Sequence, residues 1–573
     1  MSRRPSRNRN GRPQQPSPAG PADKSPDFPL RITIIVVVLA LVTGFALRAI
    51  DLKADPPPDL SWSSAIYSDE AHNAYSARNW ALYGHWQVDD YVPYVVYPWL
   101  NLFTGLVFRI AGIGFVQLKL ASLLAGLLLI PAMYFLGRSV TRRAGAIAAV
   151  IAAFSFPLVM YSRLGLAEVT QVLFVAATIA FLARAESNRA AAVLSGACAL
   201  FAVLFVKVSA LFIPFAALLV LVYELVRARS PGQRKALAGQ ALFWLLGAAV
   251  PLAIWLAVIF IPHRETYLAY VVHHSFGAKA GHPAGLVAYL LNAFSVGANS
   301  RLFARLPVVA ALGFAALPYL IGRAGRAAVF SALVLVAGVA MLGYGYYHPP
   351  RYELFTLVPL IAGFALATDR LLEGEPRLGH PWPRLPGVLL YGLWLWPLAV
   401  QVTFRRPGPG ALIAALLVGQ AASLGLWALH RTTDGGVRLR GRALRFGLAA
   451  VLVVLALGHD LTQYGGWFGT RTSMMSDYSR DLDSALPDSA VTGGFWAPAM
   501  LASSHKRALF ISDQWGVNLT DPIGRFGLTH LVVTDQAEFH LLDSITGGRA
   551  SQATILRRYQ VRDRSIVVLE LRP

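Results

Sequence analysis

Cysteine and charge are both scarce in this sequence. Among 573 residues there is one cysteine, Cys198, and it lies inside an apolar run. A disulfide within the chain and a cysteine-based metal site are therefore excluded. Charged residues make up 14% of the chain, against about 25% in a typical soluble protein, and hydrophobic residues make up 55%. So few charges over such a length indicate a polytopic membrane protein.

Acidic residues are scarcer than basic ones. The chain has 30 Asp and Glu residues against 51 Lys and Arg residues, which gives a net charge of +21. In a soluble protein such an excess would suggest nucleic acid as a partner. Here the Lys and Arg residues lie mostly in short segments between apolar runs, which is the positive-inside pattern of membrane proteins. We therefore expect membrane lipids as partners and no nucleic acid.

Internal repeats are absent, and low complexity is confined to the N-terminus. Residues 1–29 are basic and rich in Pro, Ser and Gly, so we expect a disordered cytoplasmic tail. The apolar run that follows, 30–50, is long enough to span a bilayer. It has no clean signal-peptidase site, which indicates a retained first span and not a cleaved signal.

Further apolar runs of suitable length predict a polytopic α-helical membrane domain over 30–458, with about 13 spans in all. With the basic N-terminus in the cytoplasm, nearly every compact basic cluster falls on the cytoplasmic side. The outer side then receives two large loops, 51–115 and 263–306. The apolar runs after the first cover 116–137, 144–162, 169–184, 190–206, 208–226, 240–262, 307–322, 327–347, 352–368, 386–403, 411–429 and 446–458.

The sequence changes character over 459–573. Short runs rich in Val, Ile and Thr alternate with polar turns that contain Gly, Asp and Pro, which is typical of strands. Helix-like pieces lie between them. We predict a small α/β domain of about 100 residues outside the membrane. Its predicted strands are 490–496, 507–512, 529–534, 554–561 and 565–571.

The most unusual polar segment is "YSDEAHNAYSARNWALYGHW", residues 67–86. Ser68 is suited to cap a helix whose first turn holds Asp69 and Glu70, and acids there need no reason beyond the helix dipole. On a continuous helix Asp69, Asn73 and Ser76 share one face. Such an amphipathic helix can lie along the outer membrane surface with its polar face toward a cavity. Its aromatic anchors would be Trp80, Tyr83 and Trp86.

This segment resembles the GT-C class of integral-membrane glycosyltransferases, and within it the protein O-mannosyltransferase, aminoarabinose-transferase and RgtA-like group. The likeness in order and sidedness runs over roughly residues 30–370. It is strongest at the acidic pair, at "MYSRLGLAE" and at "HPPRYELFTLVPL". It implies inverting transfer of a sugar from a polyprenyl-phosphate donor to a hydroxyl of a protein, lipid or glycan. The reaction would occur on the outer face of the inner or plasma membrane.

The resemblance also implies roles for individual residues. Asp69 takes the place of the general base, with Glu70 beside it, and Glu168 that of a second acid. A Lys-Pro-Pro run common after the acidic helix is replaced here by "VVYPWL", so contacts to donor or acceptor there are expected to differ. The residues expected near the donor phosphate are Arg351, Tyr352 and Lys207.

A metal is left open by the sequence. His273 and His274 lie in the second outer loop, where the aminoarabinose branch has a metal-binding histidine. The local motif is not close enough to assign them, and they are ordinary loop residues on the simpler interpretation. A divalent metal therefore remains open, without assigned ligands.

Transfer of a sugar from a lipid phosphate requires residues of these types. A sugar leaving a lipid phosphate needs a fixed cation near the leaving group, and arginine binds phosphate in a bidentate way. A carboxylate within reach of the acceptor hydroxyl supplies general-base help worth about 10²- to 10⁴-fold. Each residue also has a plainer interpretation. Lys207 can snorkel to the headgroups, Arg351 can be an interfacial anchor, and Glu168 can pair with Arg163.

Two other classes of function compete with the enzyme. A transporter or lipid flippase would carry charges near mid-membrane, broken spans in corresponding halves, and often repeat symmetry. A non-catalytic envelope assembly protein would use its C-terminal domain as a binding module. The sequence does not predict the sugar, the acceptor, the choice between a monosaccharide and an oligosaccharide donor, or the oligomeric state.

Overall fold

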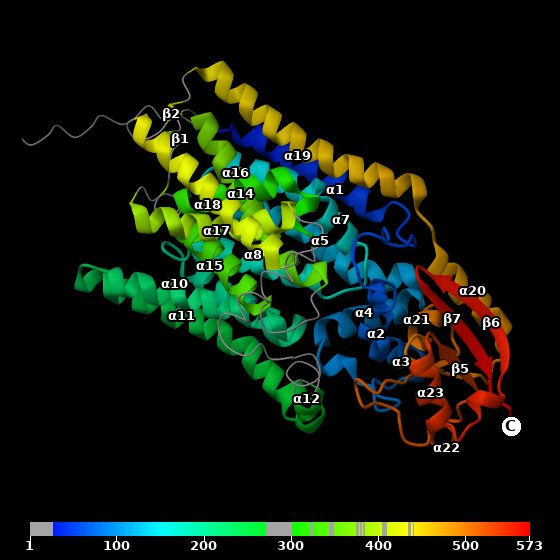
Figure 1. The fold of residues 1–573 in the computed structure, drawn as a ribbon. Coiled ribbons are helices and arrows are strands. Elements are labelled where there is room, and N and C mark those ends of the chain that lie inside the picture. Colours follow the sequence, from blue (N-terminus) through cyan, green and yellow to red (C-terminus); the bar gives the residue numbers. More distant parts are fainter. Residues whose placement is uncertain are drawn as a thin grey trace, which may run out of the picture.

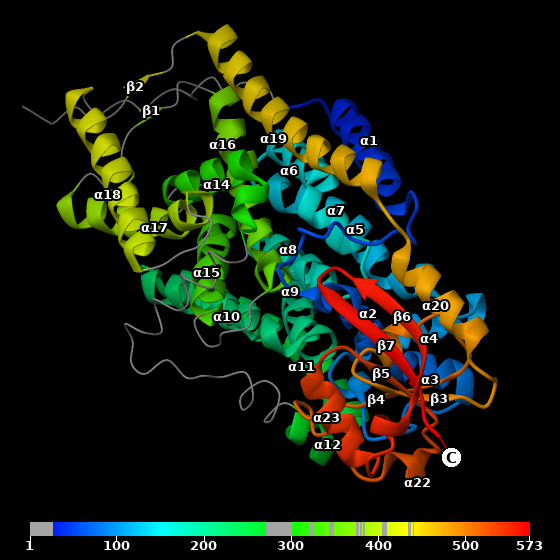
Figure 2. The same cartoon turned by 45° about the vertical axis from the view of Figure 1, so that its right-hand side comes forward.

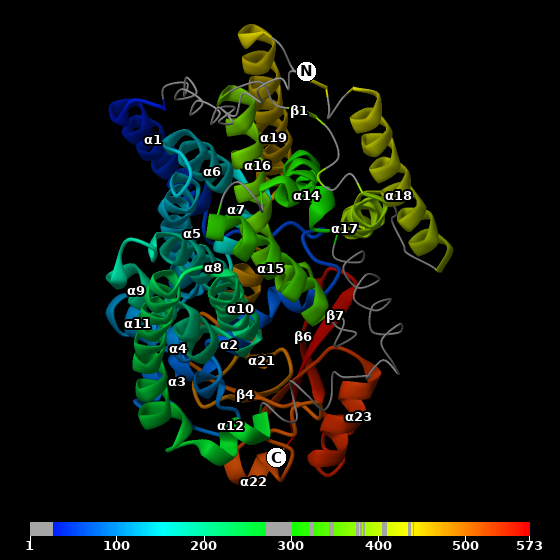
Figure 3. The same cartoon turned by 90° about the vertical axis from the view of Figure 1, so that its left-hand side faces the viewer.

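The fold consists of long apolar helices with an α/β domain at one end (Figures 1 and 3). In Figure 3 this domain lies with the short helices α2, α3 and α12 at the same end of the molecule. The computed structural model describes residues 27–270, 301–320, 325–342, 349–373, 377–378, 381, 384–403, 409–433, 437–438 and 441–572.

Every predicted apolar run coincides with a helix or helix pair. Among the described residues, eight helices are long and apolar enough to cross a membrane, or nine with one bent pair counted as a single span. The chain is thus a multi-pass membrane protein, but the predicted number of about 13 spans is not confirmed. The helices are α1 (Leu30–Ala49), α5 (Phe115–Arg138), α6 (Arg142–Phe154) with α7 (Phe156–Ser162), α8 (Glu168–Arg184), α9 (Arg189–Phe201), α10 (Phe212–Arg227), α11 (Pro231–Trp255), α14 (Pro307–Leu320), α15 (Gly325–Leu342), α16 (Leu357–Glu373), α17 (Leu385–Thr403), α18 (Pro409–Thr432) and α19 (Arg442–Thr470).

The bent pair α6–α7 turns by 58°. Pro157 lies in the first turn of α7 and has no N–H to donate to the carbonyl of Ala153, four residues earlier. The buried guanidinium of Arg48 in α1 donates to that carbonyl instead, at 2.8 Å, and to the carbonyl of Ala152 at 3.0 Å. A cation inside the helix bundle therefore satisfies the backbone groups that the bend exposes.

Helices α9 and α11 pack with their backbones in close contact. A Cβ atom added to Gly196 of α9 would lie 1.9 Å from the carbonyl oxygen of Trp244, and one added to Gly247 of α11 would lie 1.9 Å from that of Val193. Small residues of this kind allow membrane helices to approach closely.

We expect Gly196→Ala to lower the free energy of unfolding by about 1–3 kcal/mol, because the methyl group must push the two helices apart. Thermal unfolding of the detergent-solubilised protein measures the effect. Gly239→Ala, also in α11, is the matched control, since a Cβ there meets nothing within 4 Å. It should be neutral or slightly stabilising. Equal unfolding temperatures for the two variants would contradict the expected contact.

The segment between α1 and α5 folds into the short helices α2 (Asp69–Asn73), α3 (Tyr75–Tyr83) and α4 (Pro98–Ala111). The helix over the acidic segment is therefore interrupted at Ala74, and α3 ends at Gly84, whose φ of 78° is left-handed. The rings of Trp80 and Trp86 stack on each other, with centroids 4.5 Å apart. Two of the three expected aromatic anchors thus pack against each other.

The C-terminal domain contains a five-stranded mixed sheet in the order β4-β3-β5-β7-β6. Strand β3 pairs in parallel with β4 and β5, and β7 pairs antiparallel with β5 and β6. All five predicted strands are confirmed, whereas α19 extends past the predicted boundary at 458. The elements are α20 (Met474–Ala485), β3 (Val491–Gly494), α21 (Ala497–Met500), β4 (Arg507–Phe510), α22 (Pro522–Phe526), β5 (His530–Val533), α23 (Gln536–Ile545), β6 (Thr554–Val561) and β7 (Arg564–Glu570).

In Figure 2, α2, α3 and α4 lie beside the sheet. Hydrogen bonds hold the C-terminal domain against this segment, 51–115. The buried Arg78 of α3 donates to the carbonyls of Ser504 and Lys506, both at 2.6 Å. The Tyr75 hydroxyl donates to the carbonyl of Ala508 at 2.7 Å. Because buried polar groups on one side find their partners on the other, the domain has a defined position over this segment.

The contact also contains a buried carboxyl group, Asp89, whose Oδ2 lies within hydrogen-bond reach of the Tyr75 hydroxyl oxygen. Burial raises the pKa of Asp89 from 3.8 to about 6. A carboxyl whose pKa is higher in the folded protein favours folding below pH 3.8, and this stabilisation is lost as the pH rises toward 6.

We therefore expect Asp89→Asn to remove part of the loss of stability between pH 4 and pH 7. The loss of stability that the variant avoids is at most about 3 kcal/mol, because each unit of pKa change corresponds to about 1.4 kcal/mol. Unfolding temperatures of both proteins across this range provide the measurement. Burial also raises the pKa of Glu70 and Glu538, but both remain in the variant, so the difference isolates Asp89. Identical pH dependence in the two proteins would refute this assignment.

Candidate active site

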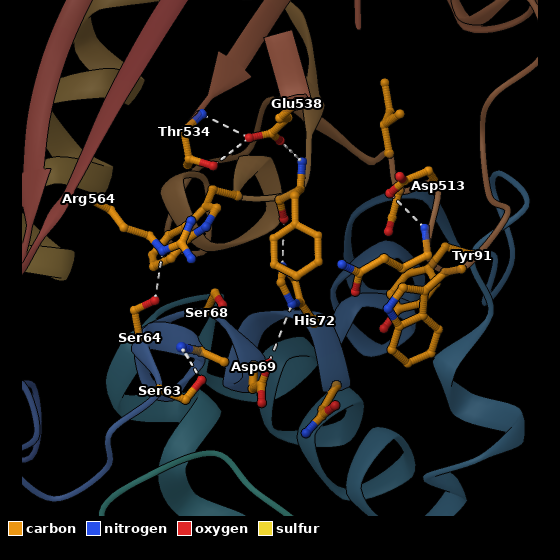
Figure 4. A pocket seen from close by; sticks show the side chains of 18 of the residues that line it. Ser63, Ser64, Ser68, Asp69, His72, Tyr91, Asp513, Thr534, Glu538 and Arg564 are labelled. Carbon is orange, nitrogen blue, oxygen red and sulfur yellow. Dashed lines mark hydrogen bonds and ion pairs between the residues drawn. The ribbon is translucent and has the colours of Figure 1, made fainter. Parts of the chain in front are cut away.

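A cavity of about 720 Å³ lies between the helical domain and the C-terminal domain. Its size is typical of small-molecule sites. Figure 4 shows Thr534 and Glu538 of the C-terminal domain on one side, with Asp69 and His72 of α2 on the other. The lining residues used below are, from the helical domain, Ser68, Asp69, His72, Asn73, Glu168, Lys207, Arg351 and Tyr352, and from the C-terminal domain Phe495, Asp513, Trp515, Asp535, Glu538 and Arg564.

Four charged side chains from separate parts of the sequence meet at this cavity. Arg351 donates from Nη2 to Asp69 Oδ2, and its Nε lies 3.3 Å from Glu168 Oε1. Lys207 Nζ lies 2.7 Å from the same Glu168 oxygen. The side chains of Arg351 and Glu168 are each 4% exposed. Two carboxylates and two cations thus balance each other in a largely dehydrated site, where their interactions are strong.

Each of these residues lies where a helix begins or is interrupted. Asp69 and Glu168 are the first residues of α2 and α8, where the dipole favours a negative charge. Lys207 is extended, between a π-helical turn (Ala202–Val206) and a 3-10 turn (Val208–Leu211). Arg351 lies in a 3-10 turn (Pro350–Thr356) that begins at a proline. Irregular turns of these kinds are frequent at functional sites.

Tyr352 contributes an aromatic face next to the cations. Lys207 Nζ lies 4.2 Å from the centre of the Tyr352 ring, within the range of a cation–π interaction. The side chain of Tyr352 therefore helps to place Lys207. With Arg351, Lys207 and Tyr352 at one cavity, the structure brings together all three residues that were expected near a phosphate.

Glu70 does not join them, although it is adjacent to Asp69. Its side chain is 4% exposed and is not among the cavity-lining residues. Its Oε2 accepts a hydrogen bond from the backbone N–H of Gly165 at 2.9 Å. Burial raises the pKa of Glu70, and the nearby Lys119 lowers it in part. Glu70 thus connects α2 to the turn that precedes Glu168. It is not brought into contact with the cavity.

The plainer interpretations of the other residues also change. Arg163 does not pair with Glu168, because its guanidinium donates to the carbonyls of Arg48, Ile50 and Asp51. Lys207 and Arg351 are both bound to carboxylates, so neither is simply a snorkelling side chain or an interfacial anchor. Ser76, expected on the face of Asp69 and Asn73, is fully buried and does not line the cavity, because the helix is interrupted before it.

Sequence reasoning missed His72 and the whole contribution of the C-terminal domain. His72 follows Asp69 by three residues, so helical spacing was an available signal. His72 Nδ1 lies 3.8 Å from Asp69 Oδ1, and its Nε2 lies 2.7 Å from the carbonyl oxygen of Phe495. The residues of the C-terminal domain lie more than 400 positions away, and no local pattern predicts that they meet α2.

The question of a metal remains where the sequence left it. Within the described residues, no group of three or more His, Cys, Asp or Glu side chains could hold a metal ion. His273 and His274 lie outside the described residues.

Comparisons with known proteins agree with this architecture. Residues 93–255 match the family model for dolichyl-phosphate-mannose-protein mannosyltransferase. The fold is similar to that of ArnT from Cupriavidus metallidurans in the apo state, with a TM-score of 0.56 and 18% sequence identity. It is also similar to the same protein bound to undecaprenyl phosphate, with a TM-score of 0.53 and 18% identity. In both cases the match covers 94% of this chain and 98% of ArnT.

Among curated proteins, none matches the chain. The matched segment 93–255 includes Glu168 and Lys207, whereas Asp69 and Arg351 lie outside it. The chain thus resembles the GT-C class of integral-membrane glycosyltransferases, through a family-model match over part of its length and through the fold that it shares with ArnT.

Proposed function

We propose that the protein transfers a sugar, with inversion, from a polyprenyl phosphate to an acceptor hydroxyl, with Asp69 as general base. The observation that carries the proposal is the convergence of Asp69, Glu168, Lys207 and Arg351 at one cavity. ArnT bound to undecaprenyl phosphate supports a polyprenyl carrier. We propose that the reaction occurs on the outer face of the cytoplasmic membrane, with the N-terminus in the cytoplasm and the C-terminal domain outside.

Arg351 and Lys207 are suited to bind the phosphate of the donor. The donor is a phosphodiester with one negative charge, and the departing polyprenyl phosphate gains a second. Cations that are already fixed in place stabilise this new charge without having to reorganise. Glu168 holds both, since its Oε1 lies 2.7 Å from Lys207 Nζ and 3.3 Å from Arg351 Nε. It thereby sets the spacing of the two cations.

Binding of the donor would also prepare the base. In the described structure Arg351 donates to Asp69, so the phosphate and the carboxylate compete for the same guanidinium. A phosphate that takes this donor from Asp69 prepares the carboxylate to accept the proton of the acceptor hydroxyl. Donor binding and base activation are thus coupled through one arginine.

The acceptor would enter between the two domains. Glu168 Oε2 is buried and, within the described residues, has no hydrogen-bond partner, so it can orient a hydroxyl group. Asn73 and Ser68 line the same side of the cavity. Attack then proceeds from the face of the sugar opposite the phosphate, which inverts the anomeric centre.

The test uses the purified protein in liposomes with undecaprenyl-phosphate sugars labelled with tritium. Mannose is offered first, then glucose, galactose and arabinose, with envelope extracts as the source of acceptor. We expect label to move from its undecaprenyl phosphate carrier to the acceptor, with stoichiometric release of undecaprenyl phosphate. The anomeric configuration of the product, read by NMR, should be opposite to that of the donor.

The competing functions give different results in this experiment. A flippase would move labelled donor across the bilayer while the sugar stays on its carrier. A binding module would retain the donor or the acceptor without turnover. Retention of anomeric configuration would refute direct attack by the acceptor, even if sugar transfer occurs.

A further inference from the structure

His72 lies between the proposed base and the C-terminal domain, and no role has been assigned to it so far. It belongs to α2, three residues after Asp69, and is 4% exposed. Its imidazole faces Asp69 through Nδ1 and the Phe495 carbonyl through Nε2. Figure 4 shows His72 beside Asp69. The ring also packs against the rings of Phe495 and Phe510, at centroid distances of 4.9 and 4.7 Å. Packing and hydrogen bonding therefore fix the orientation of the ring.

The contact with Phe495 determines which nitrogen carries the proton. A backbone carbonyl accepts hydrogen bonds and cannot donate one, so Nε2 at 2.7 Å must bear hydrogen. In the neutral imidazole Nδ1 then has a free lone pair, and it is this atom that lies 3.8 Å from Asp69 Oδ1. The carboxylate oxygen on the other side, Oδ2, is the one that Arg351 contacts.

The Phe495 carbonyl is itself held in place by Glu538 of α23. One oxygen of Glu538 accepts from the backbone N–H of Phe495 at 2.9 Å, and the other accepts from Thr534 N and Oγ1 at 2.8 and 2.6 Å. A row of contacts thus runs from Glu538 through Phe495 and His72 to Asp69. The other charged residues that line the cavity are Glu168, Lys207, Arg351, Asp513, Asp535 and Arg564.

We propose that His72 is a positioning residue whose tautomer is fixed by the C-terminal domain, and that its Nδ1 receives the proton that Asp69 takes from the acceptor. The inference rests on the proposed function of Asp69. In the first step the acceptor O–H bond breaks and its proton forms a bond to Asp69. In the second step that bond breaks and an N–H bond forms at His72 Nδ1.

The second step leaves Asp69 ionised and His72 as an imidazolium, whose Nε2 donates to the Phe495 carbonyl and whose Nδ1 faces Asp69. The proton then passes to solvent water in the cavity, and the neutral tautomer returns. No oxidant, reductant or further reactant is needed. The relay restores the base, and the negative charge of Asp69 favours the imidazolium at 3.8 Å.

The main test compares His72→Gln with the wild-type protein. The amide nitrogen of glutamine can reproduce the Nε2 donor to Phe495, but no basic atom remains at the position of Nδ1. We expect an unchanged unfolding temperature, an unchanged KM for the donor, and a fall in kcat of about 10- to 100-fold, at or below the lower end of proton-transfer effects.

A second variant separates proton transfer from packing. His72→Gly removes the ring, and added imidazole can occupy the vacated space. We expect imidazole to restore part of kcat in His72→Gly and to leave His72→Gln unchanged. A merely structural role would not depend on the basicity of the added ring, so 4-nitroimidazole, which is a much weaker base, should not restore activity.

A spectroscopic test of the tautomer requires no substrate. Histidine labelled with ¹⁵N in the full-length protein reports the tautomer by solid-state NMR, and the His72 signals are those lost in His72→Gln. We expect a neutral ring with hydrogen on Nε2. Hydrogen on Nδ1 would overturn the proposal directly.

The kinetic outcomes distinguish this inference from the proposed function. Full turnover by His72→Gln together with an inactive Asp69→Asn would overturn the relay and leave the base assignment standing. Full turnover by Asp69→Asn would overturn the proposed function and the relay together. Loss of kcat in His72→Gln with imidazole rescue of His72→Gly supports both.

Discussion

Asp69→Asn should lower kcat for sugar transfer by about 10²- to 10⁴-fold, the usual contribution of a general base. Asparagine has nearly the same shape and its amide oxygen can still accept the hydrogen bond from Arg351. The variant should therefore fold normally. Its KM for the donor should stay unchanged or fall, because the competing negative charge next to Arg351 is gone. Initial rates over a range of donor concentrations measure both parameters.

The matched control is Asp59→Asn, in the same segment of the chain. The Asp59 side chain is 78% exposed, pairs with Arg305 and does not line the cavity. It should retain wild-type kcat and KM. If both variants lost activity equally, the effect would come from the charge of the segment and not from a base. If neither did, Asp69 would not be the base.

Arg351→Met should abolish measurable transfer and also destabilise the protein. Removing one fixed group that stabilises developing charge costs about 10²- to 10³-fold in rate. In addition, removal of one partner from a buried ion pair costs about 3–5 kcal/mol, since Asp69 loses the guanidinium that it contacts and Glu168 keeps Lys207 alone. Transfer assays and thermal unfolding of the same preparations measure the two losses.

A double variant separates the two effects. Arg351→Met combined with Glu168→Gln removes one negative and one positive charge, so most of the lost stability should return while transfer remains absent. Arg351→Lys keeps the charge but loses the planar fork, and should show an intermediate rate. Recovery of transfer in the double variant would mean that Arg351 serves the fold alone.

The sequence predicted the helices and strands well because both depend on local pattern. Apolar length predicts a helix in a membrane wherever it occurs, since every backbone group must be bonded within the segment. Alternating Val, Ile and Thr likewise predicted all five strands of the C-terminal sheet. The α19 helix was predicted to end near residue 458, but it continues to Thr470. Its polar Asp460 accepts a hydrogen bond from the Phe156 backbone N–H, a partner 304 residues away that no local pattern reveals.

The site was predictable only where it depends on helix geometry. Consecutive residues point in directions about 100° apart on a helix, so Asp69 and Glu70 could not both face one cavity. Glu70 shares its face with Ala74 and Ala77, and this apolar face was a signal that Glu70 would be buried. Contacts such as His72 with Phe495 depend on how two domains meet, and composition and periodicity carry no information about that.

The attachment of the C-terminal domain affects how a lipid can arrive. Hydrogen bonds from Arg78 and Tyr75 join this domain to the segment 51–115 at several points. A rotation of the domain away from this segment would have to break all of these hydrogen bonds at once. A carrier whose hydrocarbon tail stays in the bilayer would therefore reach Arg351 edgewise, between helices at the level of the headgroups. The acceptor would use a separate route, so the two reactants would not have to enter the cavity by the same path.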